Sequence, residues 1–347
     1  MTLRYNSGMN DYGIYNTLIL NDEFEDKIKE IKNSNVWFDS EEAGYEGVIS
    51  SEVENGVLKT INAISSVKLK GEEGVELIKK GLSFAAYDES FIKYNALSGF
   101  CLLISHCITF HTHDSWMPIL YVDLNFYTKS KELIKKSKSV KYSESPDMEA
   151  KKDYLIQKAD FIDKYAQPKH VLFIDGPILG GNVSGYTIKM VEKLHKKDII
   201  PIFIVKNSNS SLVIDNIPEF KGKFNSDLHW ANSFLKEGER TNYFYYQESI
   251  NKTHNKVFSY IRPFKNMSVQ RVEFYSKTYE KYAENIDQIF NLIYYLFVVS
   301  ATQNNPQIRP IIISEMYARE TLKKFPFRKV LHDIGLTETT NQTRFGG

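Results

Sequence analysis

Ser83-Phe-Ala-Ala-Tyr-Asp88-Glu-Ser90 is an apolar run that ends in acidic residues, and Val171-Leu-Phe-Ile-Asp175-Gly-Pro177 repeats this pattern further along the chain. Short apolar runs bounded by turn residues are typical of buried strands. A carboxylate at the end of such a strand lies at the rim of a sheet, where two of them on neighbouring strands converge on a divalent cation. The two runs therefore predict a metal-dependent hydrolase.

The elements around these runs predict an α/β fold. Three strands (83–88, 99–111 and 117–127) are followed by a helix (148–166), a strand (171–175), a helix (184–197) and a strand (199–206). Three consecutive strands and then alternating helices and strands describe a mixed sheet flanked by helices. This βββαβαβ order is that of the ribonuclease H-like fold.

Further elements are expected on both sides of this core. Residues 1–82 combine a helical pattern with alternating segments and predict an N-terminal helical and β-rich lobe, so that residues 83–347 form the second domain. In the second domain we expect an added antiparallel meander with strands at 242–248, 256–263 and 268–275. Two helices follow it, at 277–301 and 311–324.

The composition excludes several classes of protein. The 347 residues include 44 Lys and Arg against 43 Asp and Glu, and a net charge of +1 provides no bulk attraction to nucleic acid or membrane. The two cysteines, Cys101 and Cys107, lie in an apolar run and are expected to be buried thiols in a reducing compartment. The N-terminus has no apolar signal core, and the apolar stretch 289–301 is too short to span a bilayer. These features predict a cytoplasmic protein without a membrane partner.

Two further acids are candidates for the same site. In a ribonuclease H-like nuclease, an acid from the first helix and a ligand from a late helix join the two strand acids and hold two cations. Asp153 is our choice on the first helix because Leu155, Ala159 and Ile162 place it near the buried face. Glu315 follows an apolar turn on the late helix. The alternatives are a solvated Asp153 and a surface Glu315 that pairs with Arg319 four residues on.

Basic residues recur at predicted strand ends and turns, where they are candidates for phosphate contacts: Lys206, Arg240, Arg262, Arg271 and Arg309. As single cations they are more often solvated or salt-bridged, so we expect one or two of them to touch DNA.

Three histidines follow one another on a strand pattern, at His106, His111 and His113. Histidine side chains are common zinc ligands, so one interpretation is a zinc site. Without a fourth convergent ligand, ordinary sheet histidines are favoured.

Seven segments in chain order resemble the NurA nuclease family over roughly residues 83–324. They are Tyr87-Asp-Glu-Ser90, Leu172-Phe-Ile-Asp-Gly-Pro-Ile-Leu179, Phe203-Ile-Val-Lys-Asn-Ser-Asn-Ser210, Glu239-Arg-Thr-Asn-Tyr-Phe244, Tyr260-Ile-Arg262, Val269-Gln-Arg-Val-Glu-Phe274 and Asn305-Pro-Gln-Ile-Arg-Pro-Ile-Ile-Ile-Ser-Glu315. A strand that ends in Asp-Gly is common, but seven such segments in the family's order are not.

The resemblance implies a manganese-dependent DNA nuclease with a ribonuclease H-like core. It also implies a homodimer that works with the hexameric HerA translocase in DNA-end processing, for repair or for defence against foreign DNA. Asp88, Asp153, Asp175 and Glu315 would hold two Mn²⁺ or Mg²⁺ ions, and Lys206 or Arg240 would steady the phosphate.

The sequence departs from the family's pattern at three places. Glu89 replaces the Gly of an Asp-Gly-Ser motif, Asp153 stands where the family has Glu, and Glu315 stands where it has His. A charged Glu in place of a neutral His changes the expected metal preference. These changes leave open a second interpretation, a catalytically inactive NurA-like subunit that docks on a ring ATPase and grips DNA.

Overall fold

The computed structural model describes residues 4–7, 16–19, 23–34, 41–45, 47–53, 56–112, 115–134, 139–179, 184–249, 251–302 and 305–339. The chain divides into two compact units, Met1–Gly44 and Tyr45–Gly347. In the first unit, β1 (Arg4–Ser7) and β2 (Asn16–Ile19) form an antiparallel pair, and α1 (Phe24–Asn33) is a separate helix.

The second unit is built on a mixed sheet whose centre has the predicted strand order. β6 (Phe84–Ala96), β7 (Gly99–Thr112) and β8 (Ser115–Thr128) form an antiparallel meander. β10 (Val171–Asp175) pairs in parallel with β6, and β11 (Ile200–Val205) pairs in parallel with β10. The order β8-β7-β6-β10-β11 confirms the ribonuclease H-like mixed sheet.

The sheet continues beyond β11 through the predicted antiparallel meander. Its strands are β13 (Phe244–Glu248), β14 (Asn255–Arg262) and β15 (Gln270–Tyr275), and β15 pairs with β11. Four short strands complete the sheet: β3 (Ser50–Val53), β4 (Gly56–Thr60), β5 (Ser66–Lys68) and β12 (Glu239–Thr241). Because β4 pairs with β13 and β5 with β12, part of the segment before residue 82 belongs to this sheet. The domain boundary at residue 82 stays a prediction.

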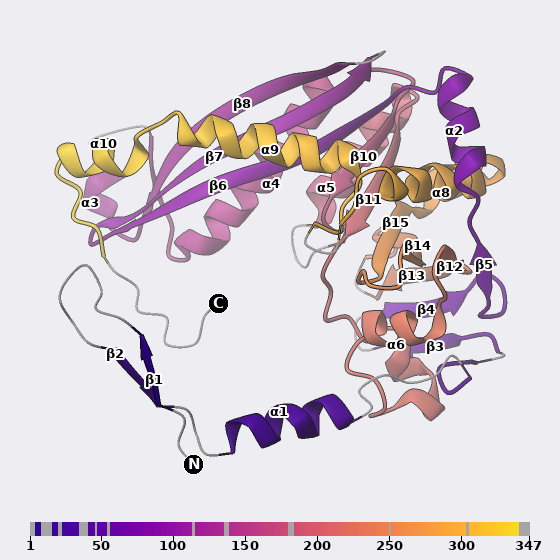
Figure 1. The fold of residues 1–347 in the computed structure, drawn as a ribbon. Coiled ribbons are helices and arrows are strands. Elements are labelled where there is room, and N and C mark those ends of the chain that lie inside the picture. The colour runs from indigo at the N-terminus through magenta and orange to yellow at the C-terminus, as the bar shows by residue number, and fades with distance from the viewer. Residues whose placement is uncertain are drawn as a thin grey trace. The chain divides into compact units, whose positions relative to one another are not determined.

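Helices cover both faces of the sheet (Figure 1). On one face, α4 (Pro146–Tyr165) and α5 (Ser184–Lys196) bury Phe161, Ile162 and Ile188 against the strands. On the other, α8 (Ala283–Val298) and α9 (Arg309–Lys323) bury Phe290 and Ile311. The smaller helices are α3 (Lys131–Ile134), α6 (Asp227–Phe234), α7 (Ser276–Lys281), α10 (Phe327–Asp333) and two short 3₁₀ turns at Ile214–Asn216 and Pro218–Phe220.

Helix α2 (Gly71–Lys79) was not predicted, and neither were α3, α6 and α10. Glycines at 71, 74 and 81 are more typical of turns than of a helix. Gly74 is buried, and a Cβ atom there would lie 2.4 Å from the carbonyl oxygen of Asn291 on α8. Glycine is thus required by the close approach of two helices rather than by a turn. Gly81, directly after the helix, has a φ of 87°, a turn conformation that favours glycine.

β8 lies near one end of the sheet. It pairs with β9 (Val140–Tyr142) only from Phe126 on, and residues 115–125 pair with no second strand among the described residues. Leu120 and Leu124 are exposed on this strand. Pro118, which has no N–H group, is tolerated on such an edge.

Both cysteines are buried free thiols, as expected. Burial raises the pKa of Cys101 to about 11 and that of Cys107 to about 12. Within the described ranges, no helix has both the length and the apolar character needed to cross a bilayer.

Candidate active site

Asp88 and Asp175 follow the last paired residues of two neighbouring parallel strands. The prediction that the first strand ends at Asp88 was wrong, because β6 continues to Ala96 as a hairpin with β7, and only β10 ends at its acid. The register pairs Ile174 with Tyr87, so the next residue on each strand is one of the two acids. Asp88 is only 4% exposed, and its Oδ1 accepts a hydrogen bond of 2.8 Å from the backbone N–H of Glu89. Its buried Oδ2 has no hydrogen-bond partner among the described residues. After Asp175, Gly176 takes a φ of 95°, which favours glycine and turns the chain away from the sheet.

The two carboxylates repel each other in a poorly solvated place. Burial, and then the charges of Asp175 and Glu89, raise the pKa of Asp88 to about 8. Burial also raises the pKa of Asp175, although the nearby Lys206 opposes this effect. Lys206 lies directly after β11, and its Nζ is 3.0 Å from Asp175 Oδ2. This predicted phosphate-contacting cation thus lies inside the acid cluster, where it offsets part of the negative charge.

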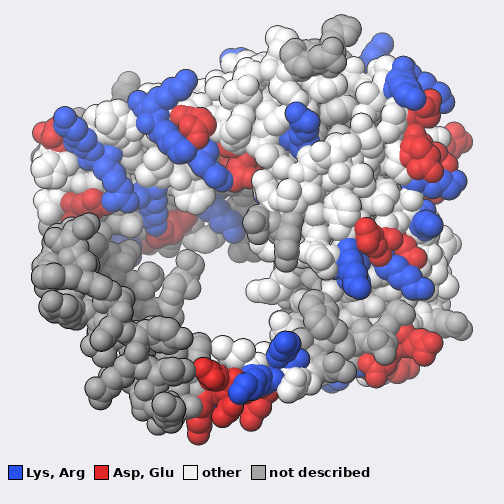
Figure 2. Space-filling model, viewed as in Figure 1, with Lys and Arg blue, Asp and Glu red and all other residues white. Residues whose placement is uncertain are grey.

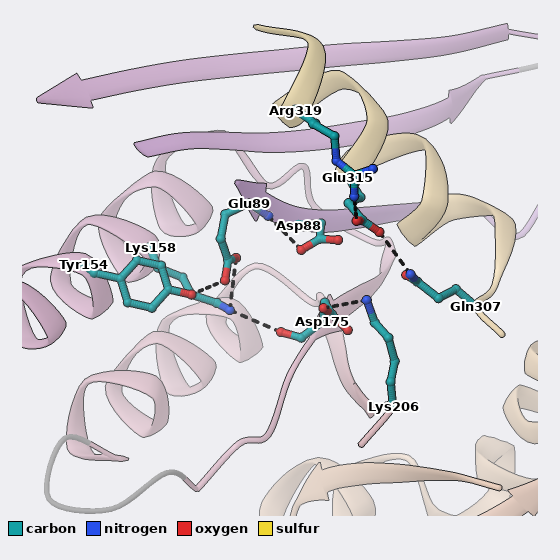
Figure 3. A network of polar contacts seen from close by, with 9 residues as sticks. All are labelled: Asp88, Glu89, Tyr154, Lys158, Asp175, Lys206, Gln307, Glu315 and Arg319. Atoms are coloured by element: carbon teal, nitrogen blue, oxygen red, sulfur yellow. Dashed lines mark hydrogen bonds and ion pairs between the residues drawn. The ribbon is translucent and has the colours of Figure 1, made fainter. Parts of the chain in front are cut away.

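Glu89 is a third acid of the cluster. The sequence left two alternatives for this residue, a place beside the metals or a side chain in solvent, and the structure places it next to the strand acids. It accepts a hydrogen bond from the Tyr154 hydroxyl, and its Oε2 is 3.4 Å from Lys158 Nζ (Figure 3). Lys158 Nζ also donates to the backbone carbonyl of Asp175 at 3.2 Å. Burial alone would raise the pKa of Glu89, but Lys158 and the Tyr154 hydroxyl hold it below its usual range. The sequence signal was available, because Tyr154 and Lys158 are four residues apart on the predicted helix.

Helix α9 carries Glu315 and is fixed on β6. Ser314 Oγ donates to the carbonyl oxygen of Ala86 at 3.0 Å and lies 2.6 Å from Thr109 Oγ1. The Glu315 carboxylate accepts hydrogen bonds from Gln307, at 3.0 Å, and from Arg319 (Figure 3). The sequence analysis gave an ion pair with Arg319 as the alternative to metal binding by Glu315, and this ion pair is present. It lies on α9, which packs on β6, the strand that carries Asp88.

Comparison with protein families identifies the chain. Residues 84–304, well over half of the sequence, match the NurA domain. The chain belongs to the NurA family. This confirms the resemblance read from the seven segments, although the matched range ends before Glu315.

Solved structures with the same fold include that of the NurA nuclease from Sulfolobus solfataricus. It is 11% identical, the alignment covers 91% of this chain and 99% of that one, and the TM-score is 0.54. Another NurA crystal structure is 9% identical over 91% of this chain and 97% of that one, with a TM-score of 0.44. An endonuclease V from Ciona intestinalis, in complex with DNA that contains an inosine, is 12% identical over 70% and 86% of the two chains, with a TM-score of 0.36. No curated protein matches the chain.

In this NurA chain the predicted first-helix acid, Asp153, makes contacts elsewhere. Its Oδ2 accepts hydrogen bonds from the Tyr127 hydroxyl, at 3.0 Å, and from Lys141 Nζ, at 2.7 Å. The side of α4 that contacts the strand acids carries Tyr154 and Lys158 instead. The structure therefore brings Asp88 and Asp175 together, adds Glu89, and places Asp153 with a different set of partners.

The predicted DNA-contacting arginines are engaged in internal contacts. Arg240 is 3% exposed, pairs with Asp287 at 2.6 Å and donates to the backbone of Thr241. Arg262 donates to the carbonyl oxygens of three residues, namely Asn232, Leu235 and Lys265. Arg271 is buried with Glu273, whereas Arg309 is exposed at the start of α9. Lys206 is thus the predicted cation that lies at the acid cluster.

The histidines do not form a zinc site in the part of the chain that the structure describes. His106 is buried, and its Nδ1 lies 2.7 Å from the Tyr87 hydroxyl oxygen. His111 stacks on Phe84, with ring centroids 4.8 Å apart. These two residues are five positions apart on β7, so they lie on opposite faces of the sheet. His113 lies outside the described residues.

The acid cluster suits a hard cation by its chemistry. Carboxylate oxygens are the donors that Mg²⁺ and Mn²⁺ prefer, and the unpartnered Oδ2 of Asp88 is buried next to Asp175. Among the described residues, however, no three His, Cys, Asp or Glu side chains are arranged as a ready-made metal cage. The ammonium groups of Lys158 and Lys206 provide positive charge at the cluster.

Most charged side chains on the face drawn in Figure 2 stand in groups that contain both signs, with uncharged surface between the groups. Basic side chains over α9 and α10 have acidic neighbours, as in the pairs Lys323–Glu320 and Arg328–Glu338. This face therefore offers no continuous basic surface, in keeping with a net charge of +1.

Proposed function

We propose that this NurA-family chain is a metal-dependent nuclease that hydrolyses DNA phosphodiester bonds. The observation that carries the proposal is the meeting of Asp88 and Asp175 on two neighbouring parallel strands, at the carboxyl end of β10, with one buried carboxylate oxygen of Asp88 that has no partner among the described residues. Its family membership and the fold it shares with a protein named as a nuclease support the same reaction class.

The residues of the cluster have separate roles in this proposal. Asp88 and Asp175 hold a divalent cation, manganese or magnesium, with Glu315 as a further ligand. When bound, the cation stabilises negative charge on a phosphodiester and lowers the pKa of water. Lys206 holds Asp175 in place and becomes available to a phosphate oxygen when a cation takes over that carboxylate. Asp153 stays a predicted ligand that Asp153→Asn tests, and the resemblance implies two ions.

The test is cleavage of linear DNA by the purified chain with manganese, with and without a chelator. Asp88→Asn and Asp175→Asn should each reduce cleavage to the level of the chelated sample while leaving the fold intact, because each change removes a ligand and keeps the side-chain size. Asp160→Asn is the matched control, since Asp160 is an exposed acid on α4. Full activity in either strand-acid variant would remove this site from the reaction.

The second candidate function is a non-catalytic subunit that docks on a ring ATPase and grips DNA. Lys158 and Lys206 already offset two of the three negative charges of the acid cluster, which is the observation that favours this alternative. Absence of manganese-dependent cleavage in the wild type, together with retained DNA binding in the presence of the ring, would support it.

We also propose the setting that the resemblance implies: a cytoplasmic homodimer that works with a HerA-like hexameric ATPase on DNA ends, in repair or in defence against foreign DNA. A chain with almost no net charge has little long-range attraction for duplex DNA. A translocating ring that feeds strands to the acid cluster would supply this attraction. Co-purification with the HerA-like protein, and stimulation of cleavage by ATP in its presence, test the partnership.

A further inference from the structure

Lys158 is placed among oxygen atoms of the kind that bind a metal ion. It is 8% exposed, and its Nζ lies 3.4 Å from a carboxylate oxygen of Glu89 and 3.2 Å from the carbonyl oxygen of Asp175. The ammonium group also lies 4.8 Å from the centre of the Tyr87 ring. Carboxylate and backbone carbonyl oxygens are the donors that a hard divalent cation takes in proteins. Because the buried Lys158 contacts both kinds of oxygen, it places a fixed positive charge where a cation could otherwise bind.

The surrounding side chains hold this lysine in place. Tyr154, one helical turn before Lys158, donates its hydroxyl hydrogen to the other carboxylate oxygen of Glu89. Glu89 therefore has partners from α4 on both carboxylate oxygens. The neighbouring Asp88 instead accepts a hydrogen bond from the backbone N–H of Glu89. The Glu89–Lys158 pair is built into the contact between β6 and α4.

Charge balance favours a single added cation. Three carboxylates, those of Asp88, Glu89 and Asp175, face two ammonium groups, those of Lys158 and Lys206. With all five ionised, this leaves one negative charge. One divalent cation reverses it by a single unit, whereas two would leave three positive charges in a poorly solvated place.

We propose that Lys158 permanently takes the place of one cation, so that this chain binds one divalent ion, at Asp88 and Asp175, rather than two. The proposal rests on the proposed function, because it concerns the same site. Glu89 is then a positioning residue that anchors Lys158. The side of α4 that contacts the cluster carries Lys158 rather than an acid, and with a single ion no acidic ligand is needed there.

The test counts manganese ions per chain, by equilibrium dialysis and metal analysis on the full-length protein at saturating Mn²⁺. The wild type should bind one ion. Lys158→Met, which keeps the apolar stem and removes the charge, should bind two, because it frees the Glu89 and Asp175 oxygens. Lys158→Met with Glu89→Gln should return to one ion. Lys164→Met, a change to an exposed lysine on the same helix, is the control and should bind one ion.

Each outcome decides the proposal. Two ions per wild-type chain, with manganese-dependent cleavage, would overturn the inference and leave the proposed function standing. No bound ion and no cleavage would overturn both. One ion in both the wild type and a folded Lys158→Met variant would show that Lys158 does not replace a cation. If Lys158→Met fails to fold, the wild-type count decides together with Lys158→Arg, which keeps the charge and should bind one ion.

Discussion

At the scale of single residues, Glu315 puts a negative charge where the family resemblance leads us to expect a neutral His. Its carboxylate is held by Gln307 and Arg319, so a cation that recruits it competes with an ion pair. This competition weakens the contribution of Glu315 relative to the buried Asp88.

We predict that Glu315→Gln raises the manganese concentration needed for half-maximal cleavage, because a neutral amide is a poorer ligand than a carboxylate. Glu315→His should retain some cleavage and shift the metal preference toward softer ions. Titration of cleavage against Mn²⁺ and Mg²⁺ measures both effects. A Gln variant with an unchanged metal titration would assign Glu315 to its ion pair with Arg319 alone.

His106 makes the stability of the fold depend on pH. Burial lowers the pKa of this histidine from 6.5 to about 4, so the folded chain keeps it neutral while the unfolded chain takes up a proton near pH 6.5. Its contribution to the free energy of unfolding is therefore complete above pH 6.5 and is lost as the pH falls to 4, by up to about 3 kcal/mol. Urea unfolding at pH 7 and pH 5 should show a smaller pH dependence for His106→Gln than for the wild type. Equal dependence in the two proteins would mean that His106 is not the group responsible.

The residues of the site differ in how visible they are in the sequence. Asp88 and Asp175 could be predicted because an acid that follows an apolar run is a local pattern, and the two runs lie side by side as parallel strands in matching register. Asp153 and Lys158 lie on one helix, and their roles depend on the rotation of α4 about its axis. Apolar periodicity specifies that rotation only to within about one residue. The sequence therefore identified the correct helix but did not show that Lys158 would contact the acid cluster.

At the scale of elements, most strands and helices of the core were predicted within a few residues, because their apolar runs are clearly bounded. The predicted strand 83–88 was too short, because β6 continues through polar residues to Ala96, and the predicted helix 277–301 is divided into α7 and α8. α2 was missed because three glycines in twelve residues contradict helix propensity. The packing of α2 on α8 outweighs this propensity. The apolar run of α8 is more apolar than a one-sided helix requires, and its second face was expected to pack on another subunit or on the N-terminal lobe; α2, which lies within residues 1–82, covers part of it.

Gly74 and Gly71 provide a matched pair for testing this contact. We predict that Gly74→Ala destabilises the fold by about 1 to 3 kcal/mol, because its Cβ would meet the rigid backbone of α8 at Asn291. At Gly71 the nearest atom to a new Cβ is a Tyr294 ring carbon at 3.7 Å, an ordinary contact. Gly71→Ala should therefore be neutral or stabilising by up to about 1 kcal/mol. Chemical denaturation compares the two, and equal effects would mean that α2 does not approach α8 this closely.

At the scale of the whole molecule, we predict a homodimer with about twice the 40.2 kDa mass of the chain in light scattering. The open edge of β8 suits pairing with a second copy, because its exposed Leu120 and Leu124 are placed symmetrically about Val122. Val122→Pro removes an N–H group from that edge and should give the single-chain mass if the edge forms the dimer. A wild-type mass of 40.2 kDa would contradict the dimer and leave the catalytic proposal untouched.

The strand order also has a consequence for the sequence of events during folding. β6, β7 and β8 follow one another closely along the chain, so their pairing closes small loops. β10 pairs with β6 in the sheet, but β7, β8 and α4 come between the two strands in the chain, so this pairing closes a long loop. Local pairings generally form before distant ones, because closing a long loop costs more chain entropy. Asp88 is thus positioned early within a hairpin, and the mutual repulsion with Asp175 arises only when the parallel pair closes. Lys158 on α4 and Lys206 after β11 lower the electrostatic cost of that late step, because each pairs with an acid of the cluster.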